Sequence, residues 1–313
     1  MEHKKITKDG EMSNFIKKKN RLKKKLDAKL LKENKEGRLL GVEQCFRKAM
    51  PWYHINIGYT NPYNVGRVHA ELMLIEKHLE KSLKGCSDPI LNALKNKEII
   101  FYGIGVGDTE AAIVDWLLKS GEDNIAITGI DVNRDFLENF TVALRNRLIE
   151  EEGGKTISYR AYNSLFEQIT KKDLINGKLK KAHICLGGTI GNFYDQKSII
   201  STFSNLSESR DILILGIQLE TKLEILFEKY RNNSLFREFV LSYIPENERS
   251  YLKWYYNKET GIIAAKHNDI EIFRSMKYNL KKLRNSIESE NFKLIYQDSD
   301  KEKNIGLQVY EKR

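Results

Sequence analysis

Three closely spaced glycines follow an apolar stretch and can bring a ligand against bare main chain. Gly103, Gly105 and Gly107 come directly after the apolar residues 99–102. Glycine lacks a Cβ atom and reaches backbone dihedrals closed to other residues, so a ligand can approach such a turn closely. Asp131 stands 28 residues after Gly103, at the end of the next apolar stretch, where a carboxylate can accept both hydroxyls of a ribose. This spacing predicts a nucleoside-cofactor site.

Two cofactor classes use such a layout. A dinucleotide favours GxGxxG and places its pyrophosphate on the following helix, whereas enzymes that use S-adenosylmethionine (SAM) favour GxGxG with an acid upstream. Gly107 and the upstream Glu98 favour SAM. Asp108 and Glu110 place negative charge at the next helix start, which would repel a pyrophosphate and suit a sulfonium or ammonium group. The alternative without a ligand is a tight structural turn.

Composition limits the class of protein. A chain of 313 residues buries a sizeable core, and we expect one large domain with an accessory layer. No apolar run reaches membrane-spanning length and no signal-peptide pattern opens the chain, so a cytoplasmic protein without membrane contact is expected. The three cysteines lack metal-ligand spacing, and neither a disulfide framework nor a metal site is expected. We expect a monomer.

The positive charge is concentrated at one end of the chain. Residues 1–50 contain 16 Lys/Arg and 7 Asp/Glu, a balance of +9 within a total of +10. This basic segment predicts a helix that either binds a polyanion or lies as a solvated helix on the core, and the second interpretation is favoured. The aromatic and amide-rich residues 51–67 follow, ahead of an amphipathic helix over 67–83. They indicate either a lid or a packed connector.

Apolar and amphipathic stretches alternate from residue 98 onward. Strands are expected at 98–103, 125–131, 156–161, 182–187 and 211–217, and helices at 109–120, 134–151, 164–172, 195–207 and 220–230. This alternation predicts an α/β fold with a parallel, doubly wound, Rossmann-like sheet that binds ligands at the carboxyl ends of its strands.

The pattern changes after about residue 235. Strands at 250–256, 261–266, 270–277 and 307–311, with a helix at 279–290, are expected to add antiparallel strands over or beside the sheet. Four parts are therefore expected: a basic helical extension (1–50), an aromatic lid loop and helix (51–95), the cofactor-binding core (96–235) and a substrate-side α+β addition (236–313).

The end of the fourth predicted strand carries the most specific motif. Residues 186–193 read Leu-Gly-Gly-Thr-Ile-Gly-Asn-Phe. This run resembles the signature of the histidine-specific SAM-dependent methyltransferases, which trimethylate the α-amino group of histidine on the way to ergothioneine. The glycine turn, Asp131, residues 218–222 and residues 275–278 follow the family order, so the resemblance covers about residues 50–313. It implies a class I methyltransferase fold.

The resemblance implies roles for individual residues on the cofactor side. The residues that would hold SAM are Gly103, Gly105, Gly107, Asp131, Ser164, Leu165 and Gly187. Asp131 would hold the ribose, and Ser164 with Leu165 would take the place of an Asp-Phe pair that holds adenine. A lysine that the family carries after the glycine turn is Thr109 here.

The resemblance also implies catalytic and acceptor-binding residues. Asn192 would hydrogen-bond the acceptor amine, Tyr230 would help grip the substrate, and Tyr63 is the candidate tyrosine of the lid. The alternatives from the sequence are that Asn192 caps the helix expected near Asp195 and that Tyr230 is a core residue.

One family residue is replaced at the acceptor end. The family binds the imidazole of histidine with a Glu two residues before a Ser, and this sequence has Phe273 two residues before Ser275. Glu271 is expected on the same strand face by period-two spacing, one pleat away. The favoured acceptor is therefore a small amino-acid-like amine related to histidine, with histidine itself left open.

Three functions remain as alternatives. The first is SAM-dependent N-methylation of a small amine. The second keeps the cofactor but uses the basic segment to recruit RNA or an acidic peptide, with nucleic acid possible and not favoured. The third is a SAM-binding protein without catalysis, against which the complete signature argues.

Overall fold

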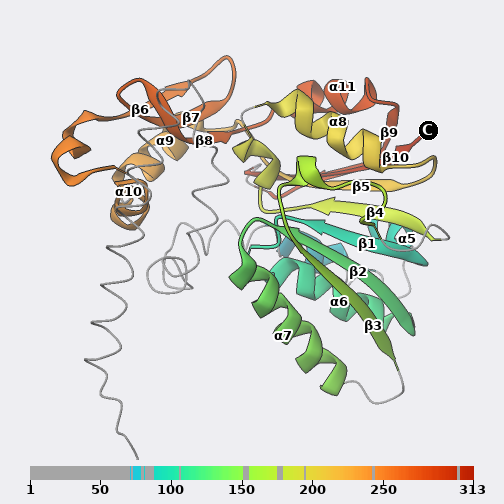
Figure 1. Cartoon of the computed structure of the whole chain (residues 1–313). Helices are drawn as coiled ribbons and strands as arrows, with labels where there is room; N and C mark the ends of the chain where they lie inside the picture. Colours follow the sequence, from blue (N-terminus) through green and yellow to red (C-terminus); the bar gives the residue numbers. More distant parts are fainter. Residues whose placement is uncertain are drawn as a thin grey trace, which may run out of the picture.

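We describe a computed structural model over residues 71, 73–78, 81, 88–105, 107–150, 155–174, 179–193, 195–241, 244–301 and 304–313 (Figure 1). The basic segment and the aromatic loop that the sequence predicts lie outside these residues. None of the helices in the described part of the chain combines the length and hydropathy needed to cross a membrane.

The larger sheet has seven strands and follows the predicted winding. Its strands are β1 (Lys97–Tyr102), β2 (Asn124–Asp131), β3 (Thr156–Asn163), β4 (Lys180–Cys185), β5 (Ile212–Gln218), β9 (Phe292–Ser299) and β10 (Ile305–Lys312). Their order is β3-β2-β1-β4-β5-β10-β9. The first five strands are parallel, and β10 runs antiparallel to both neighbours. The chain reverses its winding between β1 and β4, which is the position where open α/β sheets bind ligands.

Helices cover both faces of this sheet (Figure 1). One face packs on α5 (Pro89–Leu94), α6 (Asp108–Lys119) and α7 (Arg134–Glu150), and the other on α8 (Gln196–Leu206) and α11 (Leu280–Glu288). A strand covered on both sides is expected to be apolar at nearly every position. All seven residues of β5 are accordingly buried. The predicted doubly wound α/β fold is confirmed.

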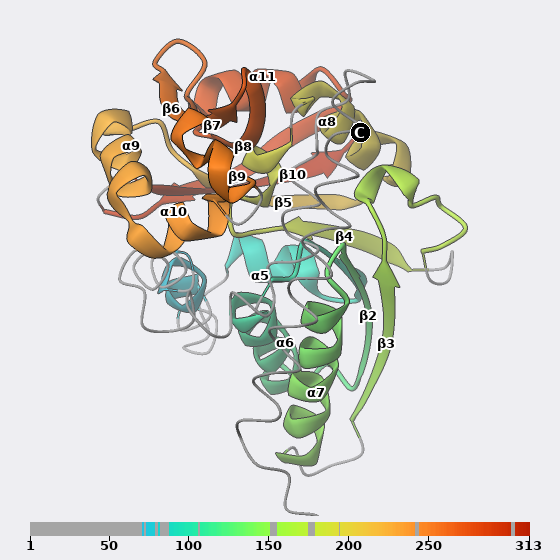
Figure 2. The same cartoon turned by 60° about the vertical axis from the view of Figure 1, so that its left-hand side comes forward.

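A smaller sheet lies beside the carboxyl ends of the large sheet (Figure 2). It is antiparallel, in the order β6 (Leu252–Asn257), β7 (Ile262–His267) and β8 (Ile270–Met276). Helices α9 (Leu223–Asn232) and α10 (Ser234–Leu241) pack on it and form a separate apolar core. The predicted C-terminal antiparallel additions are confirmed, with three strands in this sheet and two beside β5.

Two predicted elements differ in the structure. The helix expected at 164–172 is wrong, because only a short 3-10 helix forms at Phe166–Gln168. The carboxylate of Asp173 accepts the amide of Thr170 at 2.8 Å, and this removes a donor that an α-helix would need. The sequence interpretation also missed β9, although its buried and exposed residues alternate with the period of a strand.

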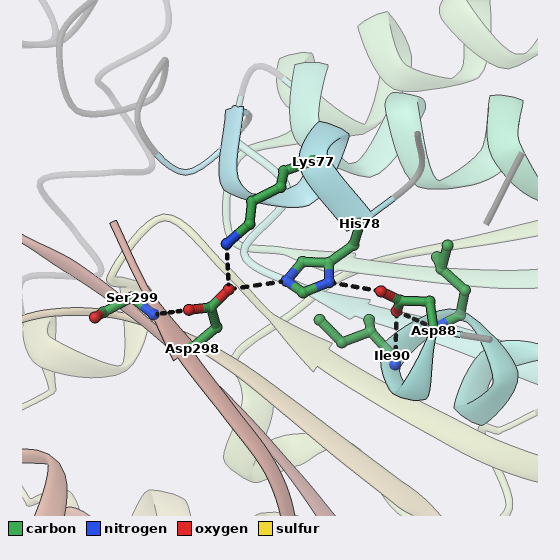
Figure 3. A network of polar contacts seen from close by, with 7 residues as sticks. Lys77, His78, Asp88, Ile90, Asp298 and Ser299 are labelled. Carbon is green, nitrogen blue, oxygen red and sulfur yellow. Dashed lines mark hydrogen bonds and ion pairs between the residues drawn. The ribbon is translucent and has the colours of Figure 1, made fainter. Parts of the chain in front are cut away.

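A helical segment ahead of the large sheet is anchored by a polar network (Figure 3). We call residues 71, 73–78 and 81 the Glu71 helix. The His78 ring lies 2.7 Å from the Asp88 carboxylate and 3.4 Å from that of Asp298 on β9, which also accepts Lys77 Nζ at 2.8 Å. Burial alone would raise the pKa of Asp298, but the hydrogen bonds from Lys77 and the following backbone amide hold it below its usual value. The network fixes the helix against the sheet edge.

Candidate functional site

The turn after β1 contains three glycines with positive φ, but they serve different purposes. A Cβ atom on Gly103 would lie 2.6 Å from the Thr189 side chain, and one on Gly107 would lie 2.8 Å from the Phe140 ring. A Cβ atom on Gly105 would meet no described atom within 4 Å. Packing therefore requires glycine at 103 and 107, whereas Gly105 presents bare main chain toward a space that no described residue fills.

Asp131 ends β2 directly beside this turn. One carboxylate oxygen accepts the Asn133 amide at 2.8 Å and the other accepts the Gly105 amide at 3.2 Å. Burial raises the pKa of Asp131 to about 6, and the backbone donors only partly oppose this shift. At neutral pH the residue is a buried carboxylate whose oxygens can still accept hydrogen bonds, which suits the hydroxyls of a ribose.

The residues predicted to hold adenine lie next to Asp131. The Ser164 amide donates to the Asp131 carbonyl at 3.2 Å, and the Ser164 hydroxyl donates to Gln168 at 3.0 Å. Leu165 follows, half-buried and in extended conformation. The pairing of β2 with β3 thus brings Asp131, Ser164 and Leu165 together at one sheet edge.

The signature after β4 forms a second glycine turn. Gly187 and Gly188 have φ values of +69° and +66°, and the Gly188 amide donates to the Gly216 carbonyl on β5 at 3.2 Å. The Thr189 side chain fills the space beside Gly103, where a Cβ atom would collide with it. The two turns, predicted separately, are therefore in direct contact at the winding reversal.

Asn192 lies at the end of the short 3-10 helix Thr189–Asn192 and is half-buried. Its predicted alternative role as a helix cap is wrong, because Asp195 caps α8 by accepting the amides of Lys197 and Ser198, both at 3.0 Å. Its side chain makes no hydrogen bond within the described part of the chain. The Asn192 amide thus remains available to a ligand.

A buried lysine joins the two sheets at the carboxyl end of β5. Lys277, 1% exposed, follows β8. Its ammonium donates to the hydroxyls of Ser275 at 2.7 Å and Tyr230 at 3.1 Å, and to the Gln218 side chain. It also lies 4.9 Å from the centroid of the Tyr230 ring, within cation–π range. The two predicted acceptor residues Tyr230 and Ser275 are therefore brought together by a residue that sequence reasoning did not assign.

The expectation that Glu271 shares a strand face with Ser275 is wrong. Phe273 pairs with Ala265, yet Glu271 pairs with the next residue, Lys266, because a β-bulge shifts the register between them. Adjacent residues of one strand point to opposite faces, and the extra residue in β8, Ile272, breaks the alternation there. Glu271 therefore faces away from Phe273 and Ser275.

The contacts of Glu271 agree with this placement. Its carboxylate accepts the hydroxyl of Tyr255 and lies 3.2 Å from the Arg274 guanidinium. Both partners lie on the face of the small sheet opposite to Ser275, as their register with Ala264 shows. Glu271 is thus held in an ion pair and does not replace the missing family Glu.

Phe273 packs inside the smaller core. Its ring centroid lies 4.9 Å from that of Phe236, 5.6 Å from that of Tyr230 and 6.0 Å from that of Trp254. It is 6% exposed. The ring of Tyr230 is therefore a core residue and its hydroxyl accepts from Lys277, while its predicted contact with the substrate stays a prediction.

Glu98, the acid upstream of the glycine turn in the sequence, lies away from that turn in the structure. It is the second residue of β1, at the opposite end from Gly103, and it accepts a hydrogen bond from Thr128 on β2 at 3.2 Å. The acid that does lie near the turns is Glu71, which is 3% exposed and whose carboxylate accepts the Gly187 amide. Its sequence signal was a carboxylate on the apolar stripe of a predicted helix.

The candidate tyrosine of the lid, Tyr63, lies outside the described residues, so its role stays a prediction. Within the described residues, no group of three or more His, Cys, Asp or Glu side chains is arranged to hold a metal ion.

Comparisons with known proteins identify this arrangement. The family model described as "Histidine-specific methyltransferase, SAM-dependent" matches residues 76–253, more than half of the chain. No curated protein matches the chain in sequence.

Two solved structures share the fold. The magnesium protoporphyrin IX methyltransferase of Synechocystis PCC 6803, solved with bound S-adenosylhomocysteine (SAH), is 12% identical, with a TM-score of 0.51 and coverage of 87% of this chain and 98% of its own. A protein of Pyrococcus horikoshii OT3 is 10% identical, with a TM-score of 0.50 and coverage of 84% and 99%. The cofactor is SAM, and the chain belongs to the family of histidine-specific, SAM-dependent methyltransferases.

Proposed function

We propose that the protein transfers the methyl group of SAM to the nitrogen of a small amino-acid-like amine related to histidine. The observation that carries this proposal is the position of the Tyr230–Lys277–Ser275 cluster at the carboxyl end of β5, next to the β4 turn that holds Asn192. The residues proposed for the cofactor and those proposed for the acceptor thus lie at the same end of the large sheet.

The cofactor side fits SAM at three points. Gly105 offers open main chain, Asp131 offers a buried carboxylate, and Gly187 provides a turn with positive φ after β4. When bound, SAM supplies a methyl group on a cationic sulfur: the amine lone pair forms the N–C bond, the S–C electron pair stays on sulfur, and a proton leaves the nitrogen.

Asn192 is the proposed residue for the acceptor amine. The amine must be neutral to use its lone pair, and the side-chain carbonyl of Asn192 can accept one of its N–H groups and orient it. Since Asp195 caps α8, this function does not compete with a structural hydrogen bond at the helix start.

The lysine cluster supports an acceptor that carries a carboxylate. Lysine is a donor only, so the hydroxyl oxygen of Ser275 accepts from Lys277 and can direct its own proton elsewhere. The cluster therefore offers an O–H donor beside a positive charge. A carboxylate is the complementary group.

The part of the site that would face the acceptor's side chain lacks the carboxylate with which the family binds histidine. Phe273 occupies the position of the family Glu, and Glu271 faces the opposite side of the small sheet. We therefore propose a related amino acid with an apolar or aromatic side chain, for which an aromatic contact replaces the charged hydrogen bond.

The test is calorimetric titration with SAH, followed by histidine, phenylalanine, tryptophan and leucine, with mass spectrometry of products formed from SAM. We expect SAH binding that Asp131→Ala abolishes, and amino-acid binding that Asn192→Ala abolishes. A methylated apolar or aromatic product supports the proposal. SAH binding without a response to any amino acid would refute the acceptor class and leave the cofactor site intact.

The basic segment favours a second candidate. Its balance of +9 over residues 1–50 suits an RNA or an acidic peptide as the methyl acceptor. Deletion of residues 1–40 separates the two candidates. Loss of salt-dependent RNA or peptide binding together with loss of turnover would favour the macromolecule, whereas unchanged amino-acid turnover would favour the small amine.

A further inference from the structure

We propose that Glu71 is an electrostatic residue of the methyl transfer, with its carboxylate at the end of the site that receives the cationic sulfur and methyl group of SAM. The proposal rests on the cofactor site proposed above, and it adds a residue that comes from outside both glycine turns.

The position of Glu71 in its helix is unusual for a carboxylate. Glu71, Leu74, Ile75 and His78 are buried on one side of the Glu71 helix, while Met73 is half exposed. This spacing is the apolar stripe by which a helix packs on a core. Burial of a charged group is costly unless other groups compensate it, so a carboxylate in this stripe needs a specific environment.

That environment is the carboxyl end of β4 and the adjacent part of β5. The Gly187 amide donates to both Glu71 oxygens, at 2.8 and 3.0 Å. A Cβ atom on Gly216 would lie only 1.9 Å from Glu71 Oε1. Gly216 thus interrupts the apolar residues of β5 at the point where the carboxylate lies against the strand.

The order of the strands relates this carboxylate to the cofactor. Asp131, the proposed ribose contact, is the last residue of β2, and Ser164 and Leu165, at the proposed adenine end, follow β3. The strand order is β3-β2-β1-β4-β5, so the turn after β1 and then Gly187, after β4, lie on the side of β2 away from β3. With adenine and ribose held at the ends of β3 and β2, the sulfur end of SAM would lie toward β4, where Glu71 accepts the Gly187 amide.

The electrostatic influence of Glu71 already reaches the neighbouring strand. Burial raises the pKa of the Cys185 thiol at the end of β4, and the negative charges of Glu71 and Glu110 raise it further. Charges interact strongly in such a water-excluded region. A sulfonium placed there is stabilised by the same field that disfavours a thiolate.

The test compares the affinities of SAM and SAH, which differ by the methyl group and the charge on sulfur. Calorimetry in the absence of acceptor is run on the wild type, on Glu71→Gln, which keeps an oxygen for the Gly187 amide, and on Glu76→Gln. Glu76 lies on the same helix and is only half-buried, so it is a matched control. We expect Glu71→Gln to weaken SAM about tenfold, SAH less than about twofold, and Glu76→Gln to change neither.

Equal weakening of SAM and SAH would overturn the proposal and reduce Glu71 to a support for the β4 turn; unchanged affinities would overturn it as well. If Glu71→Gln does not fold, Gly216→Ala is used, since its methyl group displaces the Glu71 carboxylate. It should lower the preference for SAM over SAH, and an unchanged preference contradicts the proposal. Failure of the cofactor site is distinguishable, because Asp131→Ala would then retain SAH binding.

Discussion

The ammonium of Lys277 lies 3.1 Å from the hydroxyl of Tyr230 and 4.9 Å from the centre of its ring, so one lysine contacts both the polar and the aromatic part of the same residue. Tyr230 belongs to α9 and Lys277 follows β8. This contact, together with the hydrogen bond to Gln218 at the end of β5, joins the smaller sheet to the larger one where the acceptor is proposed to bind.

Replacement of Lys277 by Met should weaken the acceptor and spare the cofactor. The hydroxyls of Tyr230 and Ser275 lose the donor that orients them, and we expect acceptor KM to rise at least about tenfold. Stability should fall by about 1–3 kcal/mol, because the buried side-chain oxygen of Gln218 loses its donor. Steady-state kinetics and SAH calorimetry check this. The control is Lys253→Met, which removes an exposed lysine of β6. A parallel loss of SAH affinity would contradict the assigned role.

Cofactor binding should depend on pH through Asp131. Its pKa of about 6 in the native state means that the carboxylate is charged only above that pH, and a charged carboxylate is the better acceptor for ribose hydroxyls. SAH affinity, measured calorimetrically from pH 5 to 8, should rise through about pH 6. Asp131→Asn should bind SAH weakly and without this inflection; an inflection that persists in the variant would assign it to another group.

Stability should depend on the same group in the opposite direction. A native pKa of about 6 against 3.8 means that the folded protein binds the Asp131 proton more tightly than the unfolded chain. The contribution of this proton to the free energy of unfolding is fully present below about pH 3.8 and is lost as the pH rises to about 6. The loss amounts to about 3 kcal/mol. Urea unfolding of wild type and Asp131→Asn, without ligand, should show the difference between their free energies of unfolding changing over this range. A constant difference would refute the shift.

Gly105 and Gly121 allow backbone strain to be separated from ligand contact. Both have positive φ, +58° and +89°, and a Cβ atom on either would meet no described atom within 4 Å. Alanine at each should therefore cost about 1–2 kcal/mol of stability. Only Gly105→Ala should lower SAH affinity, by at least about tenfold, because its methyl group enters the proposed ligand space. Thermal unfolding and calorimetry measure the two effects, and equal SAH affinities would remove Gly105 from the site.

Substitutions of Asn192 and Asp195 should likewise separate a loss of acceptor binding from a loss of stability. Asp195→Ala removes the cap of α8 and should cost about 1 kcal/mol of stability without changing turnover. Asn192→Ala should leave stability nearly unchanged and abolish acceptor binding while SAH still binds. Denaturant unfolding and product formation, measured on both variants, test the assignment. A large loss of stability in Asn192→Ala would return this residue to a structural role.

The sequence alone determined the local elements and their order. Apolar stretches of strand length alternating with amphipathic ones predicted the doubly wound sheet, since that pattern buries both faces of parallel strands. The glycine turn, Asp131 and the run at 187–193 were visible because each is a short stretch with an unusual composition. The helix expected at 164–172 failed because the side chain of Asp173 bonded locally to the backbone.

Only the tertiary structure decided which distant residues meet. Spacing along the chain cannot show that Glu71 lies against Gly216, or that Lys277 reaches Tyr230, because these contacts depend on how separate elements pack. The face on which Glu271 lies was likewise beyond the sequence, since a single bulge residue reverses the alternation of a strand. Local pattern fixes each element by hydrogen bonding and periodicity, whereas the acceptor site depends on contacts between elements far apart in the chain.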